Sequence, residues 1–240
     1  SDNVGVTSVQ FLLDGATLGA PATTAPYSIT WDTTTATNGA RTLSARASDA
    51  AGNTATATAV NVTVLNSTNT GFLAPSANAA VTSSAGDNNG FQTTPANAYT
   101  DDGLFAVDAS SGTNTNTSCT NAGKDKHIYR DYGVSLPGGA TINGIEVRLD
   151  AMVNNAANNP RMCVQLSWNG GTSWTAAKTT TTLSTTEQTY LLGSAVDTWG
   201  RAWANGDFSN ANFRLRVINI ASSTARTFSL DWLAARVTYQ

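Results

Sequence analysis

Apolar and polar residues alternate along several segments of the chain, which is the period-two pattern of half-buried β-strands. Ile145, Val147 and Leu149 fall on one face of such a segment, and Ala151 and Val153 continue that face. No stretch keeps an apolar period of 3.6 residues through three turns. The pattern therefore predicts an all-β protein with long polar loops.

The same alternation recurs further along the chain. Apolar side chains share one face in two later segments, first Phe213, Leu215 and Val217, and then Phe228, Leu230 and Trp232. Strands are predicted at residues 103–107, 127–134, 141–153, 161–168, 173–180, 189–192, 212–220 and 227–239. About eight strands of this kind are typical of two packed sheets, so we predict a jelly-roll β-sandwich over residues 72–240.

Residues 1–65 form a second, smaller β domain in this interpretation. Its predicted strands are residues 7–13, 27–31, 41–47 and 56–64. In the second of these strands, Tyr27, Ile29 and Trp31 lie on one face. Residues 66–71 are polar and have no apolar period, so we interpret them as a linker.

Turn signals separate these strands. Asp14-Gly15 ends the first strand, and Asn38-Gly39 precedes the third. Residues 49–53 are expected to join the last two strands as a hairpin loop.

The first domain resembles a known family. The resemblance rests on a set of motifs, which are Asp2-Asn3-Val4-Gly5-Val6, Val9-Gln10-Phe11-Leu12-Leu13-Asp14-Gly15, Pro26-Tyr27-Ser28-Ile29-Thr30-Trp31-Asp32, Asn38-Gly39 and Asp49-Ala50-Ala51-Gly52-Asn53. Together they look like a bacterial Ig-like domain, a repeat of large secreted and cell-surface proteins that also occurs beside the catalytic domains of polysaccharide-degrading enzymes. The resemblance covers residues 1–65 and implies a spacer or adhesive module without catalysis.

The family pattern has two strands before the segment that starts here at Asp2, and this chain lacks both. In an Ig sandwich they lie beside the strand that carries Tyr27, Ile29 and Trp31, so the core facing Phe11 is expected to be uncovered. Each missing core side chain is worth about 1.5–3 kcal/mol, against a net stability of about 5–15 kcal/mol for a domain. Two explanations stay open: the strands were lost from the chain, or another chain supplies them by β-augmentation along Tyr27, Ile29 and Trp31.

Composition narrows the function classes. Charged residues make up 12% of the chain, the net charge is −3 and the pI is near 4.9, which argues against a nucleic-acid partner. No run approaches the 18 or so apolar residues of a membrane span. There is no basic and then apolar leader at Ser1, so we expect any signal peptide to have been removed.

Cys119 and Cys163 are the two cysteines. A disulfide between them would close a loop of about 45 residues and contribute about 4 kcal/mol in the chain-entropy model, and two free buried thiols are the alternative. The pair and the low lysine content indicate a secreted or cell-surface protein of bacterial type.

A second resemblance concerns residues 72–240. It rests on Leu136-Pro137-Gly138-Gly139-Ala140-Thr141-Ile142-Asn143-Gly144-Ile145-Glu146-Val147, on Asp197-Thr198-Trp199-Gly200 and on Phe228-Ser229-Leu230-Asp231-Trp232. These segments resemble jelly-roll modules of uncharacterised bacterial surface proteins and some phage structural proteins, which implies no assigned activity. Residues 167–174 are also similar to an Asp-box with Asn169 at the acidic position, and we interpret this single copy as a structural hairpin turn.

Catalytic chemistry is not predicted. The single histidine, His127, has no nucleophile motif near it, and we interpret it as a strand residue. A glycosidase needs two carboxyl groups about 5–10 Å apart, whereas Glu146 and Asp150 on one strand face would lie about 13 Å apart. The predicted outward faces carry Glu146, Arg148 and Asp150, and Arg214 and Arg216. They are interpreted as cross-strand pairs on a solvated surface, with a polar binding face as the alternative.

No cofactor and no metal centre are predicted, and calcium is the one cation considered. The segments Asp101-Asp102-Gly103 and Asp87-Asn88-Asn89-Gly90 have hard oxygen ligands, but both read equally well as turns.

The chain has six tryptophans, so carbohydrate binding stays a possible function. Sugar rings stack on aromatic faces, and Trp199, Arg201 and Trp203 form the candidate glycan platform. The alternative is that Trp199 and Trp203 close the end of the sandwich, while Trp168 and Trp232 are expected in the core.

Two functions of different class follow. The first is a non-catalytic extracellular structural or adhesive protein, whose domains assemble with other copies of the chain, or with a parent protein, by strand complementation into surface or filament-type assemblies. The second is a carbohydrate-binding accessory module of a secreted polysaccharide-active enzyme.

Overall fold

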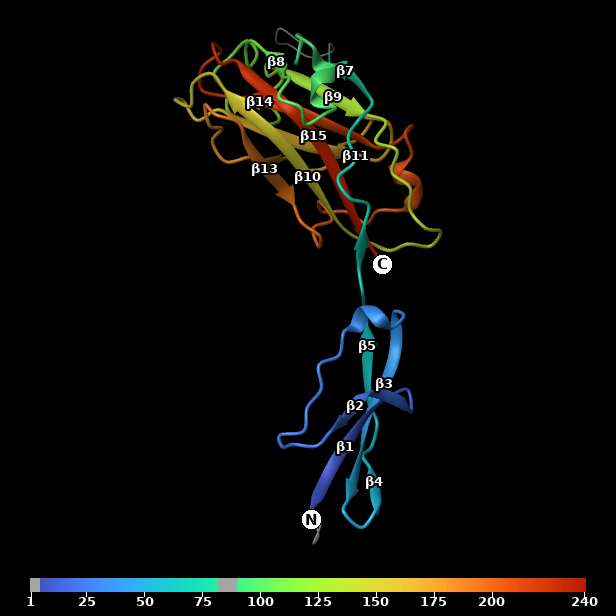
Figure 1. Cartoon of the computed structure of the whole chain (residues 1–240). Coiled ribbons are helices and arrows are strands. Elements are labelled where there is room, and N and C mark those ends of the chain that lie inside the picture. The colour runs from blue at the N-terminus through green and yellow to red at the C-terminus, as the bar shows by residue number, and fades with distance from the viewer. Residues whose placement is uncertain (1–4, 82–89) are drawn as a thin grey trace. The chain divides into compact units, whose positions relative to one another are not determined.

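The computed structural model describes residues 5–81 and 90–240 (Figure 1). The chain divides into two compact units, Ser1–Asn66 and Ser67–Gln240. Within the described residues both units are built from β-strands, with three short 3-10 helices and no α-helix, so the predicted all-β class is confirmed. The motif residues Asp2, Asn3 and Val4 lie outside the described residues.

The first unit contains one five-stranded antiparallel sheet. Its strands are β1 (Val6–Leu13), β2 (Ala16–Ala22), β3 (Gly39–Asp49), β4 (Thr54–Thr56) and β5 (Val60–Val64). The order is β2-β1-β3, and both β4 and β5 pair with β3. The long predicted strand over residues 56–64 is therefore divided, and β2 was not predicted.

Turn chemistry explains the two hairpins of this sheet. Asp14 and Gly15 both have positive φ, which suits the twist of a tight hairpin and joins β1 to β2. Asp49 Oδ1 accepts hydrogen bonds from the amides of Ala51 and Asn53, at 2.9 and 2.8 Å. These bonds close the predicted loop between β3 and β4.

The predicted strand over residues 27–31 is not a strand in the structure. Figure 1 shows the chain between β2 and β3 as an open trace, interrupted by the 3-10 helix η1 (Thr33–Thr35). The alternation itself is present, because Tyr27, Ile29 and Trp31 are half-buried. Among the described residues no neighbouring strand supplies the ladder of backbone hydrogen bonds that would make this segment a strand.

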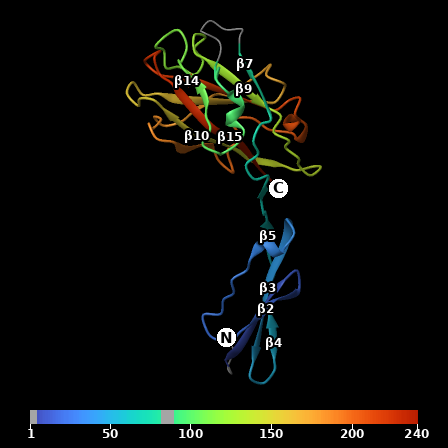
Figure 2. The ribbon, with the colours of Figure 1, turned by 45° about the horizontal axis from the view of Figure 1, so that its top comes forward.

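The second unit is a sandwich of two antiparallel sheets, which lie in separate layers in Figure 2. One has the order β13-β10-β15-β6, with β8 also on β15, and the other has the order β12-β11-β14-β9-β7. The strands are β6 (Thr68–Asn69), β7 (Ala77–Ala80), β8 (Ala106–Asp108), β9 (Lys126–Arg130), β10 (Ile142–Val153), β11 (Arg161–Ser167), β12 (Lys178–Thr179), β13 (Gln188–Gly193), β14 (Arg214–Ile220) and β15 (Phe228–Tyr239), with η2 (Pro95–Ala98) and η3 (Asn205–Phe208).

Eight of these strands correspond to predicted ones, whereas β6 and β7 were missed. β6 corrects the predicted linker, because Thr68 and Asn69 pair with Tyr239 and Thr238 of the last strand. This short edge strand has polar side chains and therefore no apolar alternation in its sequence. It pairs through backbone groups alone.

The core of the second unit lies between its two sheets. The predicted inward faces are confirmed: Ile145, Val147 and Leu149 of β10 are fully buried, as are Leu215 and Val217 of β14.

Trp232 does not continue the inward face on which Leu230 lies, so that part of the prediction is wrong. On β10, Asp150 stands opposite Trp232 and Ala151 stands opposite Leu230, which leaves Asp231 as an extra residue. This bulge reverses the phase of β15 and turns Trp232 to the outer face.

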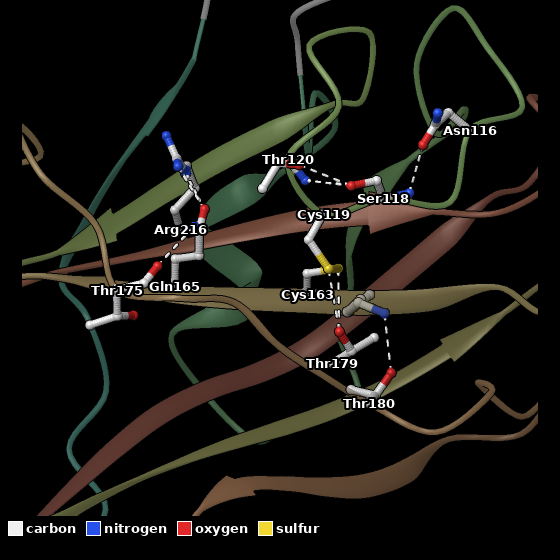
Figure 3. The surroundings of a disulfide bond; sticks show 11 residues. Asn116, Ser118, Cys119, Thr120, Cys163, Gln165, Thr175, Thr179, Thr180 and Arg216 are labelled. Atoms are coloured by element: carbon white, nitrogen blue, oxygen red, sulfur yellow. Dashed lines mark hydrogen bonds between the residues drawn. A yellow bond between two sulfur atoms is a disulfide. The ribbon is translucent and has the colours of Figure 1, made fainter. Parts of the chain in front are cut away.

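The predicted disulfide joins Cys119 to Cys163, and this prediction is confirmed (Figure 3). Cys163 lies on β11 and is fully buried with Ile218 and Ile220. The bond ties the polar loop that contains Cys119 to the outer side of this sheet. Within residues 5–81 and 90–240, no helix has the length and apolar character needed to cross a bilayer.

Candidate functional site

An apolar groove opens on the sheet of the first unit. It has a volume of about 600 Å³. Phe11, Leu18 and Leu43 line it from the sheet, and Ile29 and Trp31 line it from the unpaired segment. The two sides approach at one end, since Ile29 packs directly over Gly19, where an added Cβ would lie 2.5 Å from Ile29 Cδ1.

This unit has almost no buried core. Among its described residues, Val64 is the one fully buried apolar side chain. Val60 on β5 is 62% exposed, and the other apolar residues of the groove are at most half-buried. A sheet in a folded domain buries its apolar face against a second layer, whereas the apolar residues of this groove stay partly exposed.

Polar groups along the segment 27–31 are also incompletely satisfied. The indole Nε1 of Trp31 is shielded from solvent and has no hydrogen-bond partner among the described residues. The hydroxyl of Tyr27 donates to the carbonyl of Val6 at 2.7 Å, which holds one end of the segment near β1. A buried donor without an acceptor is costly, so Trp31 Nε1 lowers the stability of this segment.

The predicted glycan platform consists of Trp199, Arg201 and Trp203. Both tryptophans were expected to be exposed, but the structure buries them. Trp199 is 4% exposed and Trp203 is 8% exposed. The indole of Trp199 donates to Ile145 O at 2.9 Å, and that of Trp203 donates to Thr198 O at 2.8 Å. These bonds anchor both rings inside the sandwich.

Arg201 packs against the rings of the buried tryptophans. Its guanidinium lies 4.2 Å from the ring centroid of Trp168 and 4.5 Å from that of Trp203. It also pairs with Asp207 at 2.8 Å. The three residues of the predicted platform therefore close one end of the second unit, and a sugar ring has no free indole face there.

A polar pocket lies on the outer face of β10 and β13 instead. Its volume is about 340 Å³. It is lined by Asp101, Arg148, Asp150, Glu187, Gln188 and Thr189. Arg148 bridges two of the carboxylates, at 2.8 Å from Asp150 and 3.3 Å from Asp101. The guanidinium of Arg148 also stacks on Trp232, 4.6 Å from the ring centroid.

Carboxyl groups converge at this pocket, which the sequence did not predict. Burial raises the pKa of the Glu187 carboxyl, and the negative charge of nearby Asp231 raises that pKa further. Asp231 is held by the backbone amide of Gly103, which donates to its carboxylate at 3.1 Å. From the sequence, only Glu146 and Asp150 were considered as a carboxyl pair, and the carboxyl groups of Asp101, Asp150 and Glu187 that line this pocket were missed.

The predicted charged faces belong to different sheets. Glu146 pairs across strands with Arg236 at 2.6 Å, a partner that was not among the predicted residues. Arg214 and Arg216 lie on the other sheet and cannot pair with Glu146 or Asp150.

Of the two candidate calcium segments, the structure describes Asp101-Asp102-Gly103. The Asp102 carboxylate accepts a hydrogen bond from the amide of Leu104 at 3.0 Å. This bond between residues two apart is typical of a turn. Asp87, Asn88 and Asn89 lie outside the described residues. Within residues 5–81 and 90–240, no group of three or more His, Cys, Asp or Glu side chains is arranged to hold a metal ion.

Two remaining sequence predictions concern local structure, and both are confirmed. His127 is a buried residue of β9 whose Nε2 is hydrogen-bonded to Asn78 Oδ1 at 2.9 Å. The Asp-box-like segment is a turn in which Asn169 Oδ1 accepts the amide of Ser173 at 2.8 Å. Ser167 Oγ accepts the amide of Gly171 at 2.8 Å.

Comparison with known families supports the resemblance of the first unit. A family model described as a bacterial Ig domain matches residues 1–45. No curated protein matches the chain.

Several solved structures resemble the chain weakly. One belongs to a study of the promiscuous specificity of carbohydrate-binding modules of the β-sandwich superfamily, with 10% identity, a TM-score of 0.30, and coverage of 98% of this chain and 86% of that one. Modules of endo-1,4-β-D-xylanase 10B from Clostridium thermocellum match at 10% identity and a TM-score of 0.30, over 57% of this chain and 24% of that one. The catalytic domain with two carbohydrate-binding domains of Clostridium perfringens ZmpB matches at 10% identity and a TM-score of 0.25, over 85% and 18%. Scores this low carry no argument about function.

Proposed function

We propose that the chain is a non-catalytic extracellular structural or adhesive protein, whose first unit is completed by β-strands supplied by a neighbouring chain. The single observation that carries this proposal is the 600 Å³ apolar groove beside the unpaired segment 27–31. A strand with alternate apolar residues would cover the groove and pair with the backbone groups along Tyr27, Ile29 and Trp31.

Energetics favour completion of this unit. Fully burying an apolar side chain the size of Leu43 or Ile29 contributes about 1.5–3 kcal/mol, so covering several of them gives a sizeable driving force. A donor strand that comes from the next copy makes a head-to-tail contact, and such contacts produce open-ended assemblies. An extracellular location agrees with the disulfide between Cys119 and Cys163.

Replacement of Ile29 by Asp tests the assembly directly. We expect the full chain to form concentration-dependent assemblies in sedimentation velocity and the variant Ile29→Asp to remain monomeric, because a charge would have to be buried under the donor strand. The monomer should tolerate the change, since Ile29 is only half-buried in the free chain.

The matched control is Val196→Asp, which introduces the same charge at a residue of the second unit that is 82% exposed. This control is expected to assemble like the unmodified chain. A chain that stays monomeric at every concentration, or equal assembly of Ile29→Asp, would refute strand complementation between chains.

A second candidate function is carbohydrate binding at the polar pocket of the second unit. The observation in its favour is the convergence of Arg148, Gln188 and carboxyl groups in one open cavity, because planar polar side chains of this kind hydrogen-bond sugar hydroxyls.

The pocket can be tested with neutral polysaccharides. We expect retention of the full chain in affinity gels that contain xylan, β-glucan or mannan, with no release of reducing ends, and at least about a fivefold loss of affinity in Arg148→Ala. Arg46→Ala removes a charge from an exposed strand position of the first unit and serves as the control. Unchanged binding by Arg148→Ala would place any glycan elsewhere, and hydrolysis that Glu187→Gln abolishes would show that the chain is an enzyme.

A further inference from the structure

Three arginines gather on the outer face of the other sheet of the second unit. Arg214 on β14 stands directly opposite Arg130 on β9, and Arg216 follows two residues later, opposite Ile128. Alternate residues of a strand share a face, and the intervening Leu215 points into the core. The three guanidinium groups therefore share the outer face, where like charges on neighbouring strands destabilise a sheet.

Ion pairs offset only part of this charge among the described residues. Within residues 5–81 and 90–240, the one ion pair of these arginines joins Arg130 to Asp131 at 2.8 Å. Arg214 donates instead to the loop carbonyls of Asn210 and Ala211, at 3.4 and 3.0 Å. The fold gains no stability from placing arginine opposite arginine, and such local conflicts are typical of functional surfaces.

Arg216 is held in a fixed position. Its Nε and Nη2 donate to Gln165 Oε1 at 3.1 and 2.6 Å, and its guanidinium lies 4.1 Å from the ring centroid of Trp174. Gln165 is fixed in turn by donating to Thr175 O at 2.9 Å, as Figure 3 shows. A guanidinium that is ordered before binding loses little conformational entropy when it meets an anion.

A further positive charge, that of Lys126, lies on the same face of β9, two residues before Ile128. The buried ammonium of Lys126 donates to the carbonyls of Asn121 and Lys124, at 3.1 and 2.9 Å. Burial lowers the pKa of Lys126, the nearby charge of Arg216 lowers it further, and the carboxylate of Asp125 raises it. A ligand anion would weaken the repulsion between Lys126 and Arg216.

We propose that this arginine face, formed by Arg130, Arg214 and Arg216, binds the acid groups of an acidic polysaccharide. The planar fork of arginine matches carboxylate and sulfate groups. The three side chains are spaced about 7 Å along the strand and about 5 Å across it, which suits successive acid groups on a polymer.

The proposal is independent of the apolar groove and is tested with the full chain and two probes, polygalacturonate for carboxylates and heparin for sulfates. In affinity electrophoresis at about 20 mM salt we expect retention by at least one probe and its loss as salt rises. Arg216→Gln and Arg214→Gln should each weaken binding about tenfold or more, since a charged hydrogen bond is lost. Arg46→Gln, which removes the same charge from the first unit, should leave binding within about twofold.

Two further measurements keep the result interpretable. Arg216→Lys keeps the charge but loses the planar contact with Trp174 and Gln165, and we expect intermediate binding. If Arg216→Gln fails to fold in thermal melts, Arg214→Gln decides, because its side chain contacts only exposed loop carbonyls. The proposal is overturned if neither probe is retained at low salt, if Arg46→Gln weakens binding as much as Arg214→Gln, or if single-stranded DNA binds more tightly than both polysaccharides.

Discussion

Replacing both Cys119 and Cys163 by alanine is expected to lower the free energy of unfolding of the second unit by about 4 kcal/mol. The sequence separation of 44 residues sets this value, because the cross-link removes loop-closure entropy from the unfolded chain. Urea unfolding followed by tryptophan fluorescence reports mainly on this unit, since five of the six tryptophans lie in it.

The free energies of unfolding of the oxidised and reduced protein differ by the contribution of the disulfide. Reduction should destabilise the unmodified chain by a similar amount and leave the double variant unchanged. The difference between the reduced chain and the double variant then measures the packing of the two cysteine side chains, of which Cys163 is fully buried and Cys119 partly buried. Two reactive thiols per chain in unreduced, unfolded protein would show that the cysteines are not bonded in solution.

The polar contacts around this loop do not replace the disulfide. The buried ammonium of Lys124 donates to Asn114 O at 2.5 Å and to Ala221 O at 3.2 Å. It therefore also links this loop to the segment that follows β14. These contacts stabilise the folded state, whereas the disulfide acts on the unfolded ensemble. We therefore expect the variant to keep its native fluorescence while it unfolds at lower urea concentration.

Much of the fold could be predicted because strand alternation is a local property. Residues 141–153 were predicted as a strand, and β10 spans Ile142–Val153, since the inward face repeats over the whole strand. The short edge strands β6 and β7 carry only polar or small side chains and pair through their backbones. Their sequences therefore hold no apolar period that could have revealed them.

The candidate sites depend on contacts between distant segments, and the sequence predicted them less well. Trp199 and Trp203 look accessible in a turn-rich stretch, but the loop folds back so that Trp199 reaches Ile145 O. The polar pocket joins Asp101, Arg148 and Glu187, which lie far apart in the sequence. The family pattern predicted a strand with open edges at Tyr27, Ile29 and Trp31, whereas the structure has the alternation of half-buried and exposed residues there without a strand.

The amides of Ser28 and Thr30 are expected to exchange rapidly in a verified monomer and slowly in the native assembly. In the structure these amides have no backbone acceptor among the described residues, and both residues are exposed. Pairing with a donor strand would slow their exchange by about a hundredfold, which corresponds to an opening free energy of about 3 kcal/mol.

Amides of β3 provide the internal control for this measurement. β3 pairs with β1 on one edge and with β4 and β5 on the other, so its amides are expected to be protected in both states. Protection that appears only at Ser28 and Thr30 on assembly would locate the donor strand at the groove rather than report a general stabilisation of the unit.

Equal and strong protection of Ser28 and Thr30 in the monomer would mean that the first unit closes by itself. The groove would then be filled by groups of the same chain, and Trp31 Nε1 would find its acceptor without a partner. Rapid exchange in the assembly as well would mean that chains associate through another surface. In either case the proposal of strand complementation fails, because it requires these two amides to be free in one state and paired in the other.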